Sequence, residues 1–297
     1  MRRVSDVFEI LDERFKECIK PSARLDHLYE GCRWAEGPAY FAAGRYLVWS
    51  DIPNDRMLRY DEAADRVGVF REPAGYTNGH TTDPAGRLVS AEHGARRVTR
   101  TEHDGSITVL ADRFGDKRLN SPNDVVVHSS GAVYFSDPAY GIDSDYEGHK
   151  AEPEIGACHV FRISPEGELE IAADGFERPN GLAFSPDESR LYVSDTGVRP
   201  SPMYVFDVAG DGSLSNRRRF ATCTAGGFDG FRADTDGRIW TSAGDGVHCL
   251  APDGTLIGKV RVPETVANVC FGWPKRNRLY ICATSSLYAI LLPVNGA

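Results

Sequence analysis

One β-hairpin pattern occurs six times along the chain. Each copy has a polar opening residue, a short alternating run, a turn rich in Gly, Asp or Asn, and a second β-rich run, which together predict a hairpin. The copies are EGPAYFAAGRYLVWSDI from Glu36, NGHTTDPAGRLVSAEHG from Asn78, NDVVVHSSGAVYFSDP from Asn123, NGLAFSPDESRLYVSDT from Asn180, DGFRADTDGRIWTSAGD from Asp229 and NVCFGWPKRNRLYICAT from Asn268.

The spacing of the copies predicts an all-β fold, a six-bladed β-propeller with four-stranded blades. The openings are 42, 45, 57, 49 and 39 residues apart, which is typical of propeller blades. Runs such as RMLRYDEAADRVGVF and RRVTRTEHDGSITVL supply further strands in the intervals. An all-β sandwich, in which Asn and Asp simply mark turns, is the alternative. It does not explain why the same polar position recurs in six copies.

The last blade lacks an outer strand of its own, because the chain ends soon after SSLYAILLPV. We expect the N-terminal segment ARLDHLYEG to supply that strand and so close the ring, which removes exposed sheet edges. Residues 1–297 then form a single domain. Residues 1–22 are expected to be a helical arm packed outside, because Val4, Val7, Phe8, Leu11 and Phe15 have helical spacing.

Composition excludes several classes of protein. The chain has 297 residues, and its net charge of −9 disfavours a nucleic-acid partner. No apolar run has the length of a membrane span, and the N-terminus lacks the apolar block of a secretory signal, so we expect a cytoplasmic protein with no membrane partner. The seven cysteines are scattered and form no Cys-x-x-Cys pair, which favours reduced, buried thiols. The oligomeric state is left open.

The six opening residues are expected to meet at one mouth of the central channel. In a propeller the innermost strand of each blade lines the channel, so the first residues of these strands converge. Glu36 and Asp229 bring two carboxylates to this ring, and the other four copies bring carboxamides. Two anions in a narrow channel favour a bound cation. Because all donors are oxygens, a hard divalent ion is expected, with calcium preferred, magnesium or manganese possible and zinc less expected.

Two further features are expected at the same mouth. Asp51, Glu92, Asp137 and Asp195 each follow their blade's opening by 14 or 15 residues, so they lie where the second strand returns and form a supporting layer. The alternative is that they only cap strand ends and tie adjacent loops. The long irregular segment from Pro138 to Ala157 is expected to shape entry to the site, because loops of this length are more often functional than passive.

The segments AEGPAY, RLNSPNDVVV, RPNGLAFSPD and FDGFRADTDGRIW resemble those of the senescence marker protein/gluconolactonase (regucalcin-like) family of six-bladed propeller lactonases, from about Ala23 onward. The resemblance implies metal ligation by Glu36, Asn180 and Asp229. It implies that Asn123 is either a metal ligand or a substrate contact. It also implies that Asp229 donates and accepts the proton. His80 departs from many relatives, which leaves the substrate subsite open.

The ring is suited to hydrolysis of a lactone. A cation polarises the carbonyl, and a carboxylate such as Asp229 activates water. Carboxamides such as Asn78 and Asn123 can bind sugar hydroxyls without adding charge. Candidate substrate contacts near the mouth are His80, His93, Arg118 and Asn120. The predicted function is thus a metal-dependent sugar lactonase. An organophosphate-type esterase and a non-catalytic binding propeller are the alternatives.

Overall fold

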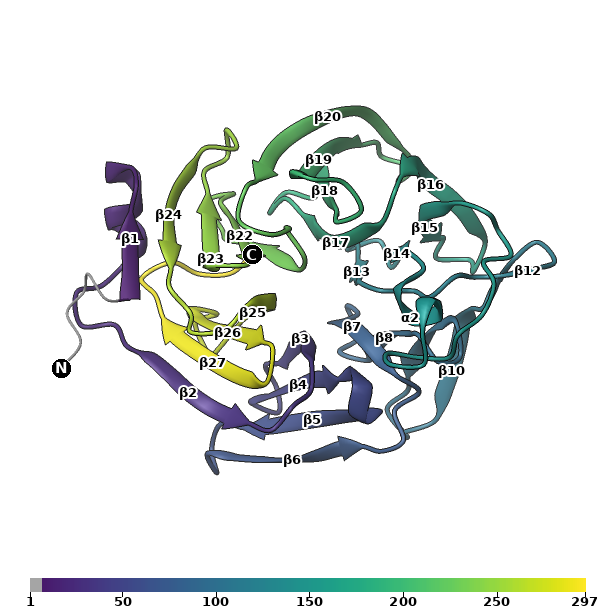
Figure 1. Ribbon diagram of the computed structural model, residues 1–297, viewed down its shortest axis with the longest axis horizontal. Coiled ribbons are helices and arrows are strands. Elements are labelled where there is room, and N and C mark those ends of the chain that lie inside the picture. Colours follow the sequence, from purple (N-terminus) through teal and green to yellow (C-terminus); the bar gives the residue numbers. More distant parts are fainter. Residues whose placement is uncertain (1–6) are drawn as a thin grey trace.

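The computed structural model describes residues 7–297 as a ring of six antiparallel sheets around a central channel (Figure 1). This confirms the predicted propeller. Each repeat forms the two inner strands of one blade, and the interval after it forms the outer strands. Blade 1 contains β3 (Ala35–Phe41), β4 (Tyr46–Asp51), β5 (Arg56–Asp61) and β6 (Arg66–Arg71), and blade 2 contains β7 (Thr77–Thr82), β8 (Leu88–Glu92), β9 (Arg97–Thr101) and β10 (Ile107–Ala111).

The next three blades follow the same order. Blade 3 contains β13 (Val125–Val127), β14 (Val133–Asp137), β15 (Cys158–Ile163) and β16 (Leu169–Phe176), and blade 4 contains β17 (Pro179–Phe184), β18 (Arg190–Asp195), β19 (Ser201–Val208) and β20 (Leu214–Cys223). Blade 5 contains β21 (Phe231–Ala233), β22 (Ile239–Ala243), β23 (Gly246–Leu250) and β24 (Leu256–Val260). A small hairpin of β11 (Arg113–Phe114) and β12 (Lys117–Arg118) lies between blades 2 and 3 in the sequence, and η2 (Ile52–Asn54) follows β4.

The N-terminal segment closes blade 6, as predicted. This blade contains β25 (Val266–Gly272), β26 (Arg278–Ala283), β27 (Ser286–Leu291) and, on its outer side, β2 (Leu25–Glu30). The β2 strand pairs antiparallel with β27, from Leu25 opposite Ile290 to Glu30 opposite Ser286. Segments from the two ends of the chain thus share one sheet, and Figure 1 shows β2 running along the outside of β27.

The expected helical arm is corrected within the described residues. Phe8–Ile10 form the strand β1, which pairs with β24 and gives blade 5 a fifth strand. A 3₁₀ helix, η1 (Glu13–Cys18), then packs outside the blade and buries Phe15 and Cys18. The open edge of β24 offers hydrogen bonds that a helix over Phe8 would leave unused, and this outweighs the helical spacing. Val4 lies outside the described residues.

Apolar clusters fill the contacts between consecutive blades. Trp49 of blade 1 and Tyr280 of blade 6 share one cluster, and Phe135 of blade 3 packs with Val89 of blade 2 in another. Clusters of the same kind join blades 1 and 2, 3 and 4, 4 and 5, and 5 and 6. Burial of this apolar surface holds the ring together.

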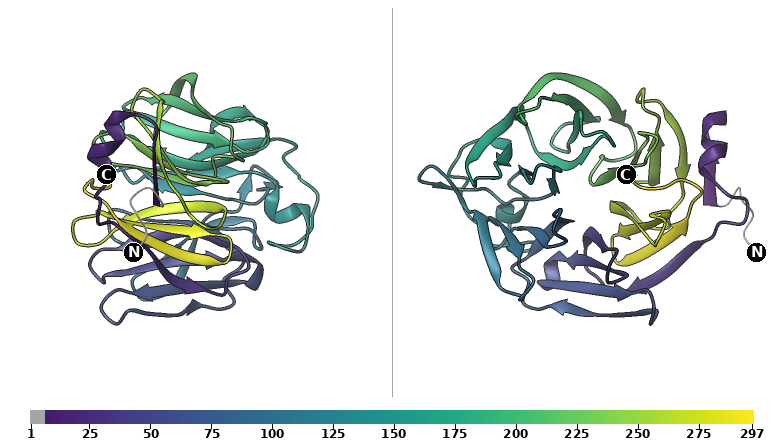
Figure 2. Two further views of the ribbon diagram at one scale, coloured as in Figure 1. Left: turned by 60° about the vertical axis from the view of Figure 1, so that its left-hand side comes forward. Right: turned by 180° about the vertical axis from the view of Figure 1, so that it is seen from behind.

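The two mouths of the channel differ. The segment that contains α2 (Tyr140–Asp143) stands out from one face of the ring (Figure 2). At the other mouth, Asp234 bridges Gly296, so the C-terminus lies by the turn between β21 and β22. In residues 7–297, no helix has the length and apolar character needed to span a membrane.

Candidate active site

Five of the six opening residues line one cavity at the mouth that carries α2. Its volume is about 330 Å³. The openings that line it are Glu36, Asn78, Asn123, Asn180 and Asp229. They converge because each stands at the start of an inner strand, or just before one, and all these strands run in the same direction through the ring. The predicted convergence is therefore correct for these five residues.

Glycines after the openings allow the inner strands to approach closely. A Cβ atom on Gly37 would lie 1.8 Å from the carbonyl oxygen of Asn78, and one on Gly181 would lie 2.0 Å from that of Asp229. Gly37 also has a φ of +57°, which disfavours other residues. The Glu-Gly, Asn-Gly and Asp-Gly pairs of the repeat are thus a packing requirement: each glycine accommodates the opening of the next blade.

The two carboxylates among the openings differ in exposure, since Glu36 is buried and Asp229 is half-buried, and a third carboxylate, Glu147, also lines the cavity. Burial raises the pKa of Glu36 well above its ordinary range, and the negative charge of Asp229 raises it further. Burial, together with the charges of Asp124 and Glu147, raises the pKa of Asp229 to about 8. Keeping both groups ionised is costly in this environment, and a divalent cation between them would remove the cost.

The free oxygen atoms of the ring fit a hard cation. Oε2 of Glu36 accepts hydrogen bonds from the Gly37 amide and from Nδ2 of Asn268, the latter at 2.9 Å, which leaves Oε1 for a ligand. Nδ2 of Asn180 donates to Oγ1 of Thr196 at 3.2 Å, so its carbonyl oxygen is free. Residues 7–297 hold no group of three His, Cys, Asp or Glu side chains that could share an ion. Carboxamide oxygens must therefore complete any coordination sphere.

Asn268, the sixth opening, supports Glu36 and does not line the cavity. Its Nδ2 donates to Glu36, while its Oδ1 accepts from the Val269 amide at 2.8 Å. Both ends of the carboxamide are therefore occupied, and they fix the direction of the Glu36 carboxylate.

The two histidines predicted to contact substrate lie behind the cavity wall. His80 bridges Oγ of Ser50 at 2.8 Å and Oγ of Ser90 at 2.9 Å. Burial lowers its pKa to about 3, so the ring is neutral. The Nε2 atom of His93 accepts from Nδ2 of Asn78 at 3.3 Å, and its Nδ1 donates to the carbonyl of Glu147 at 3.1 Å. Burial lowers the pKa of His93 to about 4. His93 thus turns the Asn78 oxygen toward the cavity.

Arg118 and Asn120 also stand away from the cavity. Nη2 of Arg118 donates to the carbonyl of Ala95 at 2.9 Å, and its amide donates to Glu154. Asn120 is buried, and its Nδ2 donates to the carbonyls of Asp137 and Ala157 at 3.0 and 2.9 Å. Both residues order the segment that leads to Asn123.

The four carboxylates of the supporting layer are buried at the ends of β4, β8, β14 and β18, as predicted. Three of them accept hydrogen bonds from backbone amides in the segment that precedes the first strand of the same blade. Asp51 accepts from the Arg33 amide at 2.8 Å, Asp137 from the Asn120 amide at 2.8 Å, and Asp195 from the Arg178 amide at 2.9 Å. Glu92 instead accepts from the side chains of Arg97 and Thr99. The layer therefore holds the opening residues in place.

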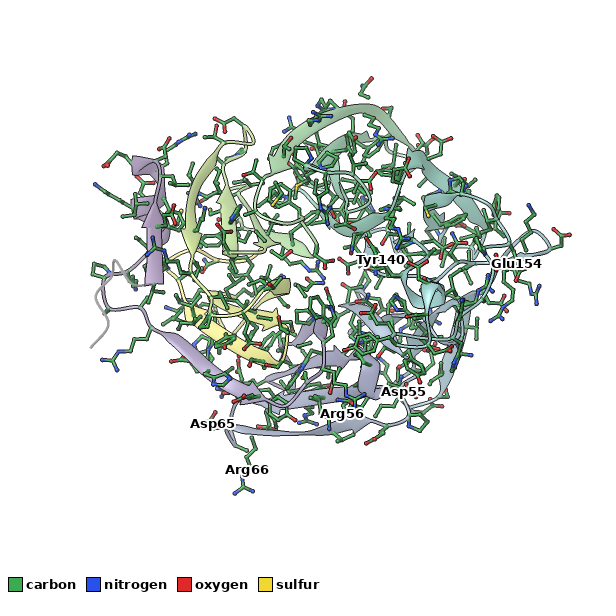
Figure 3. The ribbon with its side chains drawn as sticks, in the orientation of Figure 1. Asp55, Arg56, Asp65, Arg66, Tyr140 and Glu154 are labelled. Atoms are coloured by element: carbon green, nitrogen blue, oxygen red, sulfur yellow. The ribbon has the colours of Figure 1, made fainter. Side chains whose placement is uncertain are left out.

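The segment from Pro138 to Ala157 brings Tyr140 and Glu147 to the cavity wall. The hydroxyl groups of Tyr140 and Thr196 lie 2.8 Å apart, and Figure 3 labels Tyr140 between α2 and the centre of the ring. Ser121 fixes the base of the segment, because its Oγ donates to the Pro138 carbonyl and accepts from the Gly141 amide. Burial raises the pKa of Glu147. The segment is thus a packed wall of the site, as the sequence led us to expect.

Other wall residues were not identified from the sequence: Trp34, Thr196, Arg199 and Thr265. They lie between strands, where the repeat does not fix the direction of a side chain. Arg199 could have been predicted as a wall residue from its position in the irregular run TGVRPSP, which directly follows the fourth hairpin. Its Nη1 donates to the carbonyls of Thr196 and Val198.

The chain matches the SMP-30/Gluconolactonase/LRE-like region over residues 34–285. It belongs to this family. It is 32% identical over 301 residues to the gluconolactonase of Zymomonas mobilis subsp. mobilis, covering 93% of this chain and 83% of the relative. A gluconolactonase structure from Xanthomonas campestris has a TM-score of 0.92 at 40% identity, covering 97% of this chain and 95% of that one. The fold is shared with a calcium-binding regucalcin from Agrobacterium tumefaciens, with a TM-score of 0.78 at 21% identity, over 92% and 95% of the two chains. The resemblance read from the sequence is confirmed.

Proposed function

We propose that the protein is a divalent-metal-dependent lactonase that opens a sugar lactone of the gluconolactone class. One observation carries the proposal: the opening residues of five blades, including the carboxylates Glu36 and Asp229, line a single cavity. Similarity to gluconolactonases over nearly the whole chain supports the same activity.

The residues that would hold the metal are Glu36, Asn123, Asn180 and Asp229. Two carboxylates balance the charge of a dication, and oxygen donors without histidine or cysteine suit calcium best. The shared fold with a protein described as calcium-binding agrees with this choice. When bound, the ion supplies Lewis-acid polarisation of the lactone carbonyl.

Asp229 is the proposed proton acceptor for the attacking water. Of the two carboxylates proposed to hold the metal, Glu36 accepts a hydrogen bond from a backbone amide. Among the described residues, the side-chain oxygens of Asp229 accept none from a backbone amide or an arginine, and their hydrogen-bonding neighbour is the side chain of Asn180. A carboxylate that shares only one oxygen with an ion keeps the other for a proton. The reaction opens the ring by breaking the bond between the acyl carbon and the ring oxygen. The proton held by Asp229 then goes to the departing alkoxide.

The cavity wall is polar enough to recognise sugar hydroxyls. Asn78 presents its carbonyl oxygen because His93 holds the amide nitrogen. Tyr140 and Glu147 approach from the other side, and Arg199 adds donors. These groups can bind several hydroxyls at once, which favours a polyhydroxylated lactone over an apolar ester.

A lactone panel tests the proposal. Purified protein depleted of metal and then resupplied with calcium, magnesium, manganese or zinc is assayed with glucono-δ-lactone, a pentonolactone and a phosphotriester. Metal-dependent hydrolysis of the sugar lactones is the expected result. Preference for the phosphotriester would indicate an esterase of the organophosphate type. Metal-dependent lactone binding without turnover would indicate a binding propeller.

A further inference from the structure

Arg232 crosses the central channel below the cavity. It lies on β21, three residues after Asp229, and its side chain is 18% exposed. Nη1 donates to the carbonyl of Phe231 at 2.7 Å and to that of Leu182 at 3.4 Å, and Nη2 donates to the carbonyl of His80 at 3.5 Å. These groups belong to blades 5, 4 and 2, whose inner strands face the channel (Figure 1).

The fourth partner of Arg232 is Asp124 of blade 3. Nη1 of Arg232 and Oδ2 of Asp124 are 3.6 Å apart, and the aspartate side chain is only 2% exposed. Its oxygens also accept from the amides of Val125 at 2.9 Å and Leu182 at 3.3 Å. Asp124 follows the opening Asn123 directly, at the position where four other copies have glycine.

The sequence marks both residues as exceptions to the repeat. The residues that correspond to Arg232 in the other copies are uncharged: Ala39, Thr81, Val126, Ala183 and Phe271. A buried carboxylate and a half-buried guanidinium therefore occur together, at two positions where the repeat elsewhere has uncharged residues. Either one alone would be a costly unpaired charge.

We propose that Arg232 is a positioning residue, an internal fixed cation that closes the channel under the cavity and balances Asp124, so that Asp124 adds no uncompensated charge beneath a bound dication. This inference rests on the proposed metal-dependent function. Without Arg232, the charge of Asp124 would add to those of the cavity carboxylates, and without Asp124 a net positive charge would lie beneath the ion. In both cases the charge balance of the site would change.

A double-mutant cycle in calcium affinity tests the inference. Isothermal titration of metal-free protein gives the dissociation constant of the wild type, Asp124→Asn, Arg232→Gln and the double variant. Asp124→Asn leaves the guanidinium unbalanced and should weaken calcium binding by about tenfold or more, because a unit charge inside the protein acts strongly on a dication. The double variant should return to within about threefold of the wild type. A purely structural role predicts that the double variant binds no better than Asp124→Asn, and that outcome would overturn the inference.

Two further variants keep the test decisive. If Asp124→Asn does not fold, Arg232→Lys and Arg232→Gln are compared: the lysine variant should keep the wild-type affinity, while the glutamine variant should bind calcium at least about threefold more tightly. Equal affinities would contradict the role. Asp83→Asn is the matched control, because Asp83 pairs with Arg87 at the turn between β7 and β8, away from the cavity, and its calcium affinity should be unchanged.

The cycle separates this inference from the proposed function. If the wild type binds no divalent cation, both fail. If the wild type binds calcium and hydrolyses lactone but the double variant does not recover its affinity, the proposed function stands and the role of Arg232 is rejected.

Discussion

Glu36 and Asp229 have different surroundings, and this difference supports the two roles proposed for them. Glu36 has one oxygen held by a backbone amide and by Asn268. Asp229 is anchored through its own amide, which donates to Oγ of Ser242 at 2.8 Å, and its side chain faces the cavity. These surroundings support the proposed roles, with Glu36 as a metal ligand and Asp229 as both ligand and proton acceptor.

Replacing Glu36 by glutamine should weaken calcium binding by about tenfold or more. The shape is nearly unchanged, but one of the negative charges near the ion is lost. Calorimetric titration measures the effect, with Glu62→Gln as the control, because Glu62 is buried against Tyr40 and Tyr280 in blades 1 and 6 and does not line the cavity. Unchanged affinity in Glu36→Gln would remove Glu36 from the ligand set.

Asp229→Asn distinguishes a ligand from a base. The variant keeps a carbonyl oxygen for the ion but loses the proton acceptor. With saturating calcium, kcat should remain lower by about 10²- to 10⁴-fold, the usual contribution of a general base. Recovery of nearly the full rate in the metal-loaded variant would show that Asp229 acts only as a ligand.

Asp137 should make stability depend on pH. Burial raises its pKa to about 7, whereas an unfolded aspartate titrates near pH 4. Between these values the folded state binds more protons, so this group lowers stability as pH rises from about 4 to 7, by at most about 1.4 kcal/mol per pH unit. In Asp137→Asn, this pH-dependent contribution to the free energy of unfolding is absent. Urea unfolding at pH 5 and pH 8 should show the wild type losing about 2–3 kcal/mol relative to the variant. A constant difference would indicate that Asp137 is ionised throughout.

Individual residues were predictable where the repeat fixes them. Glu36, Asn78 and Asn180 could be placed because each starts an inner strand of the ring. His80 could not, since the pairing of β7 with β8 shifts register between Thr77 and His80, and the imidazole packs between Ser50 and Ser90. Arg118 lies in the irregular segment before Asn123, where the spacing of the repeat does not predict which way a side chain points.

At the scale of elements, the hairpins position the site and the segment from Pro138 to Ala157 gives it a wall. The hairpins could be predicted from two-residue alternation and turn residues. The conformation of the segment could not, because it depends on contacts distant in sequence. Nη1 of Arg178 pairs with Asp143 at 2.5 Å, and Tyr76 packs edge to face against His149.

Replacing the segment from Pro138 to Ala157 by a short glycine-containing turn should change KM and substrate preference more than metal affinity. It removes Tyr140 and Glu147 from the wall but leaves every opening residue. Kinetics across a lactone panel, with calcium titration in parallel, measures both effects. Arg66→Ala is the control, since Figure 3 shows Arg66 at the periphery of the ring. Changes within about twofold, or 0.4 kcal/mol, would contradict a role in substrate binding.

At the scale of the whole molecule, the number of blades and the closure by β2 followed from counting repeats and noting the missing outer strand. The arm was predicted less well. Phe8 and Leu11 have helical spacing, but the open edge of β24 draws Phe8–Ile10 into blade 5. Such pairing depends on where the edge of another sheet lies in space, which local periodicity does not report.

Removing the metal should abolish lactone hydrolysis and leave the propeller folded. The apolar clusters between blades contain none of the proposed ligands, so the ring does not require the ion for burial. A ligand that binds only the folded state at 100 times its dissociation constant adds about 2.7 kcal/mol of stability. We therefore expect chelation to lower the melting temperature by a few degrees while the far-ultraviolet circular dichroism at 25 °C stays unchanged. Adding calcium back should restore both activity and melting temperature. Unfolding at 25 °C on chelation would mean that the ion is part of the core, and full activity without metal would mean that the carboxylates of the cavity act alone.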